Sequence, residues 1–198
     1  DELYKFTFRC CIKGSSIMKK NLIILLIMFS FFNKSLANYS QLAYEFKFKG
    51  LSGELIKLSD YENKVIIVVN VASRCGFTKQ YDDLQNLWNN YKDKGLVVIG
   101  IPTNDFKQEP ASNADIKDFC EQNFNINFPM TEKINVLGNE AHPFYKWAKD
   151  NYGKAAIPKW NFHKVIIGKD GKIADTFASI TNPSSKKFIN FIEEQIKN

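Results

Sequence analysis

The composition of this chain of 198 residues limits both its architecture and its partners. With 44% hydrophobic residues and only 10 Gly and 6 Pro, the chain is long enough for one well-buried globular domain and short for two. The formal net charge of +6 is concentrated near the start, because residues 1–38 hold six Lys and Arg against two acids, which leaves 21 against 19 elsewhere. No basic stripe with interleaved aromatic residues is left, so we expect no nucleic-acid partner.

The first 37 residues have the order of a targeting signal. A basic start at residues 18–21 precedes the apolar run 22–32, and residues 35–37 (Ser-Leu-Ala) are typical of a cleavage site. This run of eleven residues falls well short of the roughly 20 that span a bilayer as a helix. We therefore divide the chain into three parts. Residues 1–17 are an upstream extension or a remnant of cloning, residues 18–37 are a signal peptide, and residues 38–198 form the folded domain. This predicts entry into the secretory pathway, with secretion or an organelle lumen as destination, or the cytoplasm if the N-terminal segment is absent or unused.

The first part of the folded domain combines strand and helix patterns. Residues 44–49 and 54–58 flank a glycine-bounded turn and predict an N-terminal β-hairpin. The run 65–69 is apolar on both faces, which is typical of a central strand covered on each side. Apolar residues then recur at helical spacing over residues 81–91, and Gly95 follows, so this segment is predicted to be a helix.

The second part predicts the remaining elements. Residues 96–101 read as another buried strand, reached by a right-handed crossover. Ser112 precedes Asp115 by three positions and predicts a capped helix whose apolar face includes Cys120. Further predicted elements are a helix over 142–151, a hairpin of 164–167 and 173–177, and a last amphipathic helix after Pro183. This order is that of a thioredoxin-like α/β fold, a central mixed sheet flanked by helices, with an extra N-terminal β-hairpin.

Cys75 is the first candidate for chemistry. It lies in residues 70–78 (Asn-Val-Ala-Ser-Arg-Cys-Gly-Phe-Thr), between the strand at 65–69 and the first helical stretch. A thiol at such a turn faces unpaired backbone N–H groups and the positive end of the helix dipole, which both favour the thiolate. Cys75 is therefore predicted to be a nucleophile, and a buried structural cysteine is the alternative.

Four motifs, in this order along the chain, resemble those of glutathione peroxidase-like proteins. They are residues 70–78, residues 104–110 (Asn-Asp-Phe-Lys-Gln-Glu-Pro), residues 128–130 (Phe-Pro-Met) with 133–136 (Lys-Ile-Asn-Val), and residues 159–162 (Lys-Trp-Asn-Phe). The similarity runs from about Tyr44 to the C-terminus and is more specific than any single motif. It implies a peroxidase whose active cysteine is Cys75, with Gln108, Trp160 and Asn161 completing the site.

The residue types of this site fit the attack of a thiolate on a peroxide. The amides of Gln108 and Asn161 and the indole N–H of Trp160 can donate hydrogen bonds to the charged sulfur and to the departing oxygen without competing as bases. Each residue also has an ordinary interpretation, since Trp160 could fill the core and the two amides could cap loops.

The two histidines of the chain are not expected to take part. Nothing in the sequence places His142 or His163 beside Cys75, so activation is predicted to come from backbone dipoles and Arg74 rather than from a Cys–His pair. We interpret both histidines as surface or satisfied residues. No set of ligands has the spacing of a metal site, so the sequence predicts neither a metal nor a cofactor.

Cys120 matches the resolving-cysteine position of the thioredoxin-dependent, cysteine-containing subgroup of the family. The implied cycle begins with Cys75 attacking a hydroperoxide, continues with Cys120 condensing with the Cys75 sulfenic acid, and ends with thioredoxin or a similar dithiol protein reducing the disulfide. A structural core cysteine is the alternative. Because a disulfide needs Cα atoms within about 7 Å, a helix that buries Cys120 away from Cys75 would have to unwind, so this segment is predicted to be among the least stable.

The chain departs from the family pattern in two places. Thr103, Asp105 and Lys107 differ from the family's usual Cys-Asn-Gln-Phe-Gly pattern, and the stretch 106–108 is one residue shorter than in the family. Gln108 is therefore assigned from the Glu109-Pro110 pair that follows it. The long insertion that tetrameric members carry between Trp147 and Trp160 is missing. Its lack implies a monomer with an open site, and glutathione becomes a less favoured reductant than a dithiol protein.

Three other functions compete with a peroxidase. A redox relay or sensor that passes oxidation from Cys75 to a partner protein would use the same residues, and the sequence does not separate the two. A peroxiredoxin would need Thr in place of Ala72, and a metal-delivery protein of the thioredoxin fold would need a second cysteine close after Cys75.

Overall fold

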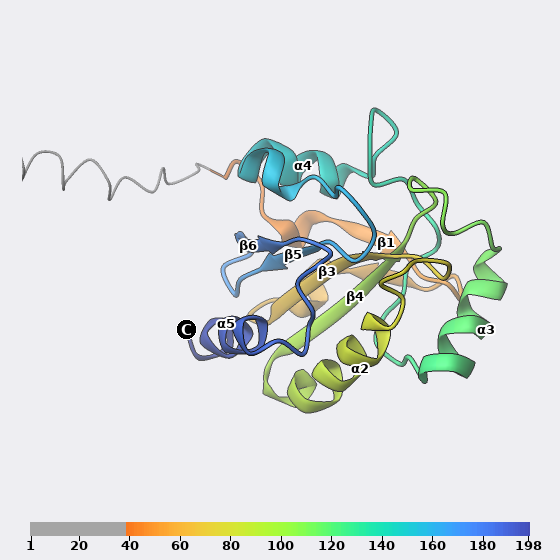
Figure 1. Ribbon diagram of the computed structural model, residues 1–198. Helices are drawn as coiled ribbons and strands as arrows, with labels where there is room; N and C mark the ends of the chain where they lie inside the picture. Colours follow the sequence, from red (N-terminus) through yellow and green to blue (C-terminus); the bar gives the residue numbers. More distant parts are fainter. Residues whose placement is uncertain (1–38) are drawn as a thin grey trace, which may run out of the picture. The chain divides into compact units, whose positions relative to one another are not determined.

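A four-stranded mixed sheet lies at the centre of the computed structural model, which describes residues 39–198 (Figure 1). The strands follow the order β4-β3-β5-β6, and their bounds are β3 Val65–Val71, β4 Leu96–Pro102, β5 Lys164–Ile167 and β6 Ile173–Phe177. β3 pairs parallel with β4 and antiparallel with β5, and β5 pairs antiparallel with β6. The predicted mixed sheet is therefore confirmed. The predictions for residues 1–17 and 18–37 lie outside the described residues.

Helices cover both faces of this sheet. The helices are α2 Gln80–Tyr91, α3 Asn113–Phe124, α4 Pro143–Tyr152 and α5 Lys186–Lys197, with short 3-10 helices at Ala43–Glu45, Leu58–Tyr61, Lys92–Lys94 and Gly153–Ala156. In Figure 1, α4 lies on one side of the sheet and α2 and α5 lie on the other, while α3 lies beside the sheet. Within residues 39–198, no helix combines the length and the apolar character needed to cross a membrane.

The central strands are apolar on both faces because each face packs against a different core. All seven residues of β3 and of β4 are buried. Val65, Ile67 and Val69 pack into the core that includes residues of α2, α3 and α5. Ile66 and Val68 pack into the second core, with α4 and the N-terminal hairpin. This two-sided burial explains the continuous apolar runs of the sequence.

The predicted hairpins and helix ends are present. β1 Lys47–Lys49 and β2 Leu55–Lys57 pair antiparallel as a separate two-stranded sheet. Gly95 follows α2 and its 3-10 extension with φ 98°, a left-handed conformation that glycine adopts at little cost. At the start of α3, the Asp115 N–H donates to Ser112 Oγ at 3.2 Å and Asp115 Oδ2 accepts from the Ser112 N–H at 3.2 Å. This reciprocal capping box confirms the predicted helix start.

The prediction of a surface or satisfied residue is wrong for His163. Its side chain is only 6% exposed, and Nε2 has no hydrogen-bond partner. The reason is its place immediately before β5, where its backbone pairs with Asn70 at the end of β3. His142 does fit the prediction, because its Nδ1 accepts from the Phe144 N–H at 3.3 Å and its ring stacks on Phe48.

Candidate active site

Cys75 lies in the turn that joins β3 to α2, as predicted, and is 9% exposed. The Phe77 N–H donates to Cys75 Sγ at 3.4 Å. Because α2 begins only at Gln80, this donor belongs to the turn and not to the first turn of the helix. The turn thus places a backbone hydrogen-bond donor on the sulfur.

The side chain of Thr78 fixes the shape of this turn. Its hydroxyl accepts from the Cys75 N–H at 3.1 Å and lies 2.7 Å from the Cys75 carbonyl oxygen and 3.1 Å from that of Ala72. One side chain thus ties the end of β3 to the residues on both sides of the sulfur. The position of the thiol is set before any substrate binds.

The Gln108 and Asn161 side chains meet beside the Cys75 turn. Asn161 Nδ2 donates to Gln108 Oε1 at 3.1 Å, and the Arg74 N–H donates to the Gln108 carbonyl oxygen at 3.1 Å. Among residues 39–198, the Gln108 Nε2 group has no hydrogen-bond partner and is free to donate to a ligand. Asn161 is completely buried, and its Oδ1 has no partner. The Arg74 side chain is exposed.

Trp160 lies at the surface of this region. It is 40% exposed, and its ring lies 5.4 Å from the ring of Phe106. The Asn70 side chain at the end of β3 holds the segment in place, since Asn70 Nδ2 donates to the Trp160 carbonyl oxygen at 3.1 Å. The alternative that Trp160 simply fills the core does not fit this exposure.

The structure brings the four predicted residues to one region without joining them all directly. Within the described part of the chain, the Cys75 sulfur has no hydrogen bond from Gln108, Trp160 or Asn161, and its polar contact is the Phe77 N–H. The connection runs from the Cys75 turn to Gln108 through the Arg74 backbone, and from Gln108 to Asn161.

The shortened stretch before Glu109 is accommodated by its backbone. Lys107 adopts φ 58°, in the left-handed region, and its N–H donates to the Asn104 carbonyl oxygen at 2.8 Å. Asn104 Oδ1 accepts from the Glu109 N–H at 3.0 Å, which closes the loop. Gln108 is the residue of this loop whose side chain meets Asn161.

Cys120 lies on α3 and points inward, as predicted, with 1% exposure. Cys75 and Cys120 are both free thiols and belong to the same core. Burial raises the pKa of Cys120 to about 11. The Tyr81 hydroxyl opposes this rise, whereas the charges of Glu109 and Glu121 add to it.

Comparison with known proteins identifies the family. The family model described as glutathione peroxidase matches residues 43–149. A protein named glutathione peroxidase from Lactococcus lactis subsp. cremoris (strain MG1363) is 42% identical over 158 residues, which covers 78% of this chain and 96% of the relative. The chain belongs to the glutathione peroxidase family. As a member of this family, the protein is a peroxidase.

Two further comparisons agree with this family. Glutathione peroxidase-like peroxiredoxin 2 from Saccharomyces cerevisiae (strain ATCC 204508 / S288c) is 42% identical over 148 residues, which covers 72% of this chain and 90% of the relative. The crystal structure of Trgpx in apo form superposes with a TM-score of 0.64 at 37% identity, covering 80% of this chain and 97% of that one. The predicted family and the thioredoxin-like fold are both confirmed.

Glu109 belongs to the region of this peroxidase that contains Cys75, although in the sequence it indicates only the position of Gln108. The residue is completely buried, and its Oε2 accepts from the Ser73 N–H and the Ser73 hydroxyl, both at 2.7 Å. Its Oε1 has no hydrogen-bond partner, and burial raises the pKa of the carboxyl group. The sequence could not predict that Glu109 is buried, because glutamate residues in loops are mostly exposed.

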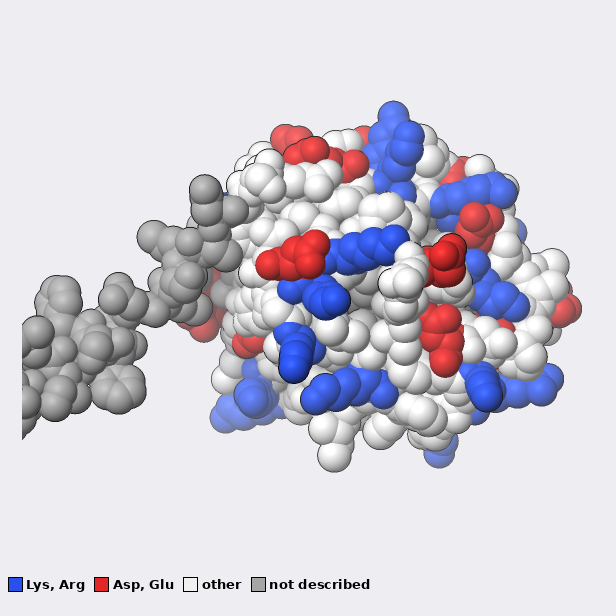
Figure 2. Space-filling view, turned by 90° about the horizontal axis from the view of Figure 1, so that it is seen from above, with Lys and Arg blue, Asp and Glu red and all other residues white. Residues whose placement is uncertain are grey.

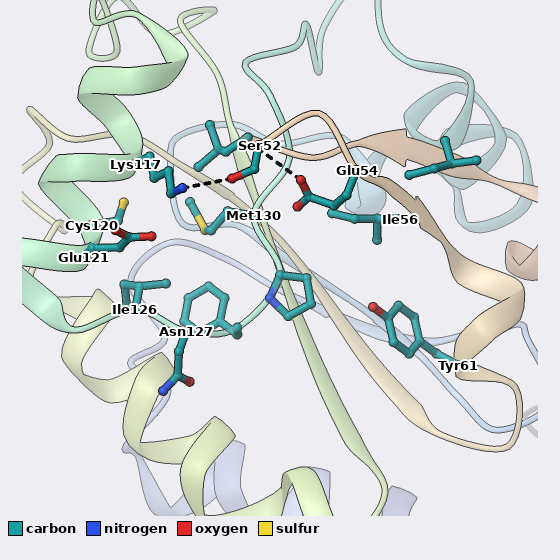
Figure 3. A pocket seen from close by; sticks show the side chains of 14 residues that line it. Ser52, Glu54, Ile56, Tyr61, Lys117, Cys120, Glu121, Ile126, Asn127 and Met130 are labelled. Carbon is teal, nitrogen blue, oxygen red and sulfur yellow. Dashed lines mark hydrogen bonds between the residues drawn. The ribbon is translucent and has the colours of Figure 1, made fainter.

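A pocket of about 360 Å³ borders Cys120 between α3 and the β1–β2 hairpin (Figure 3). Across it, Lys117 Nζ of α3 donates to Ser52 Oγ of the hairpin turn at 3.0 Å. None of the four predicted active-site residues lines this pocket. It is therefore separate from the region of these four residues.

The described residues offer neither a metal centre nor a surface of one charge on the face seen in Figure 2. Among residues 39–198, no group of three or more His, Cys, Asp and Glu side chains is arranged to hold a metal ion. On that face, basic and acidic side chains are interspersed. Mixed charges of this kind are typical of a solvated surface.

Proposed function

We propose that this peroxidase reduces hydrogen peroxide and organic hydroperoxides through a Cys75 sulfenic acid. Cys120 then forms a disulfide with Cys75, and thioredoxin or a similar dithiol protein reduces that disulfide. The observation that carries the proposal is the Cys75 turn itself. It holds a backbone N–H on the sulfur and is bonded to the Gln108–Asn161 pair.

The first step is the attack of Cys75 on the peroxide. The sulfur takes one oxygen as the O–O bond breaks, and the departing oxygen gains a proton to become water or an alcohol. Gln108 Nε2 and the Trp160 indole N–H are the donors available to that oxygen, and Asn161 fixes Gln108 through its Oε1. A preorganised donor of this kind typically contributes on the order of a hundredfold to a thousandfold in rate.

The second step requires α3 to release Cys120. The pKa of Cys120 is about 11 while α3 is folded and the thiol is buried. The thiol is therefore protonated at neutral pH and is a poor nucleophile. Only Ile116 and Cys120 of the 12 residues of α3 are buried, and the pocket leaves part of the space behind the helix unfilled. These features support a local unwinding of α3 that brings the two sulfurs together.

We further propose that the protein acts as a monomer on the secretory route after removal of residues 18–37. The missing insertion between Trp147 and Trp160 supports the monomer, since tetrameric members of the family carry it. The order of basic, apolar and small residues supports the signal peptide.

A steady-state assay that compares thioredoxin with glutathione tests the cycle. With hydrogen peroxide, thioredoxin and its reductase, the wild type is expected to turn over many times, and more efficiently than with glutathione. Cys75→Ser should be inactive because it removes the nucleophile. Cys120→Ser should still consume about one equivalent of peroxide, because Cys75 is intact, and should lose thioredoxin-driven turnover.

Two outcomes would contradict the cycle. Unchanged thioredoxin-driven turnover in Cys120→Ser would remove Cys120 from the mechanism. A wild type that reacts once and then stalls with every reductant would favour the redox relay or sensor instead.

A further inference from the structure

Tyr81, in the first turn of α2, has a buried hydroxyl without a hydrogen-bond partner. The residue is 0% exposed. Its ring packs between Phe124 of α3, at 5.2 Å, and Phe162, at 5.3 Å, which directly follows Asn161. Tyr81 thus lies between the helix that carries Cys120 and the loop that carries part of the active site.

An unpaired hydroxyl at this place is unfavourable for the fold alone. A buried donor without a partner loses its hydrogen bonds to water and gains none in return. Phe in place of Tyr81 would keep the ring contacts with Phe124 and Phe162 and avoid that cost. The hydroxyl therefore needs an explanation other than stability.

Tyr81 lies in the same core as both cysteines of the proposed cycle. Burial raises the pKa of Tyr81, and negative charges on Cys120, Glu109 and Cys75 raise it further. Of these three groups, Cys120 raises the pKa of Tyr81 the most, although its thiol does not form a full hydrogen bond with the hydroxyl. Of the groups that shift the pKa of Cys120, Tyr81 alone lowers it, while burial, Glu109 and Glu121 raise it.

We propose that the Tyr81 hydroxyl donates a hydrogen bond to the Cys120 sulfur as this sulfur attacks the Cys75 sulfenic acid, an inference that rests on the proposed function. In this step the S–S bond forms and the S–O bond of the sulfenic acid breaks. The proton of the Cys120 thiol ends on the departing hydroxide as water, so no further reductant or oxidant is needed. The hydrogen bond stabilises the negative charge that builds on Cys120 before the S–S bond is complete.

The position of Tyr81 on α2 suits this role. α2 carries five buried residues, whereas α3 carries two. When α3 unwinds, Tyr81 stays with the Cys75 turn, to which α2 is joined directly. The Tyr81 N–H donates to the Thr78 carbonyl oxygen at 3.0 Å, so the donor stays attached to the Cys75 turn while Cys120 moves.

The test follows disulfide formation in the full chain after one equivalent of hydrogen peroxide is added to the reduced protein. Samples are trapped at successive times with dimedone, which labels sulfenic acid, and mass spectrometry gives the rates of its formation and loss. Tyr81→Phe removes only the hydroxyl. Tyr145→Phe is the matched control, because Tyr145 of α4 also has a buried hydroxyl without a partner but lies in the core on the other face of the sheet.

Loss of sulfenic acid is expected to slow about tenfold to a hundredfold in Tyr81→Phe, as for a lost hydrogen bond to a charged group. Its formation should be unchanged, and its melting temperature should equal or exceed that of the wild type. Tyr145→Phe should form and lose sulfenic acid as the wild type does.

Three outcomes would overturn the inference. If Cys120→Ser accumulates sulfenic acid but Tyr81→Phe loses it at the wild-type rate, the inference fails while the proposed function stands. If Cys120→Ser also loses it at the wild-type rate, the proposed function fails and the inference with it. A melting temperature clearly lower in Tyr81→Phe than in Tyr145→Phe would show that the hydroxyl has a structural partner.

Discussion

His163 gains a proton less readily in the folded protein than in the unfolded chain. Burial, together with the smaller effect of the nearby Lys164 and Lys159 charges, lowers its pKa from 6.5 to about 4. Between these two pH values the unfolded chain binds a proton that the folded protein does not, so stability rises with pH across this window. One such group contributes a slope of up to about 1.4 kcal/mol per pH unit.

The melting temperature, measured between pH 4 and pH 6.5, is therefore expected to rise less steeply with pH in His163→Phe than in the wild type. His142→Phe is the comparison variant: burial lowers the pKa of His142 as well, but this residue is only partly buried and its Nδ1 has a hydrogen-bond partner, so the change in slope is expected to be smaller. Glu109, whose pKa is raised by burial, contributes a slope of the opposite sign and is unchanged in both variants. An undiminished slope in His163→Phe would contradict the assignment.

At the residue scale, the sequence predicted the site residues whose types and motifs are distinctive. The sequence predicts that Cys75 lies in a strand-to-helix turn, because an apolar strand pattern precedes it and a helical pattern follows it. The sequence could not show that Glu109, Tyr81 and His163 each keep a buried polar atom without a partner. Such atoms depend on how distant segments pack, which neither residue type nor spacing records.

Among the elements, α3 is the one that the proposed cycle requires to open. Its two buried residues contrast with the five of α2, and its N-terminus depends on the capping box of Ser112 and Asp115. Ser112→Ala removes that cap, which typically costs about 1 kcal/mol of helix stability. We expect amide hydrogen exchange over residues 113–124 to become about fivefold faster.

The matched control for this variant is Ser185→Ala, because Ser185 Oγ caps α5 by accepting from the Phe188 N–H. Its effect should be confined to residues 186–197. Ser112→Ala is also expected to form the disulfide at least as fast as the wild type, since unwinding becomes easier. Slower disulfide formation in Ser112→Ala would argue that an intact α3 delivers Cys120.

Most elements of the fold could be predicted because their residue patterns match a two-sided core. The runs 65–69 and 96–101 correspond to β3 and β4, which are longer at their C-terminal ends by two residues and one residue, respectively. The start of α5 is less distinct, since the helix begins at Lys186 after the cap Ser185 and not beside Pro183. Several residues near Pro183 can begin a helix, and in the structure the helix begins after Ser185, whose side chain caps it.

For the whole molecule, one sheet supports the two parts of the proposed cycle. β3 ends at the Cys75 turn, and Asn70 within it also holds the segment with Trp160 and His163. Cys120 lies on a lightly attached helix packed against the same core as Cys75. The Cys75 turn and the helix that carries Cys120 thus share one core. In the proposed cycle, one domain reacts with peroxide and then forms its own disulfide.

Peptide mapping of the oxidised protein tests this account most directly. The reduced full chain is treated with one equivalent of hydrogen peroxide, digested without reductant, and analysed by mass spectrometry. The account predicts one cross-linked species that joins the peptide of Cys75 to the peptide of Cys120 within a single chain. Cys75 found as sulfinic acid with Cys120 still a free thiol, or Cys75 linked to Cys10, to Cys11 or to a second chain, would contradict it.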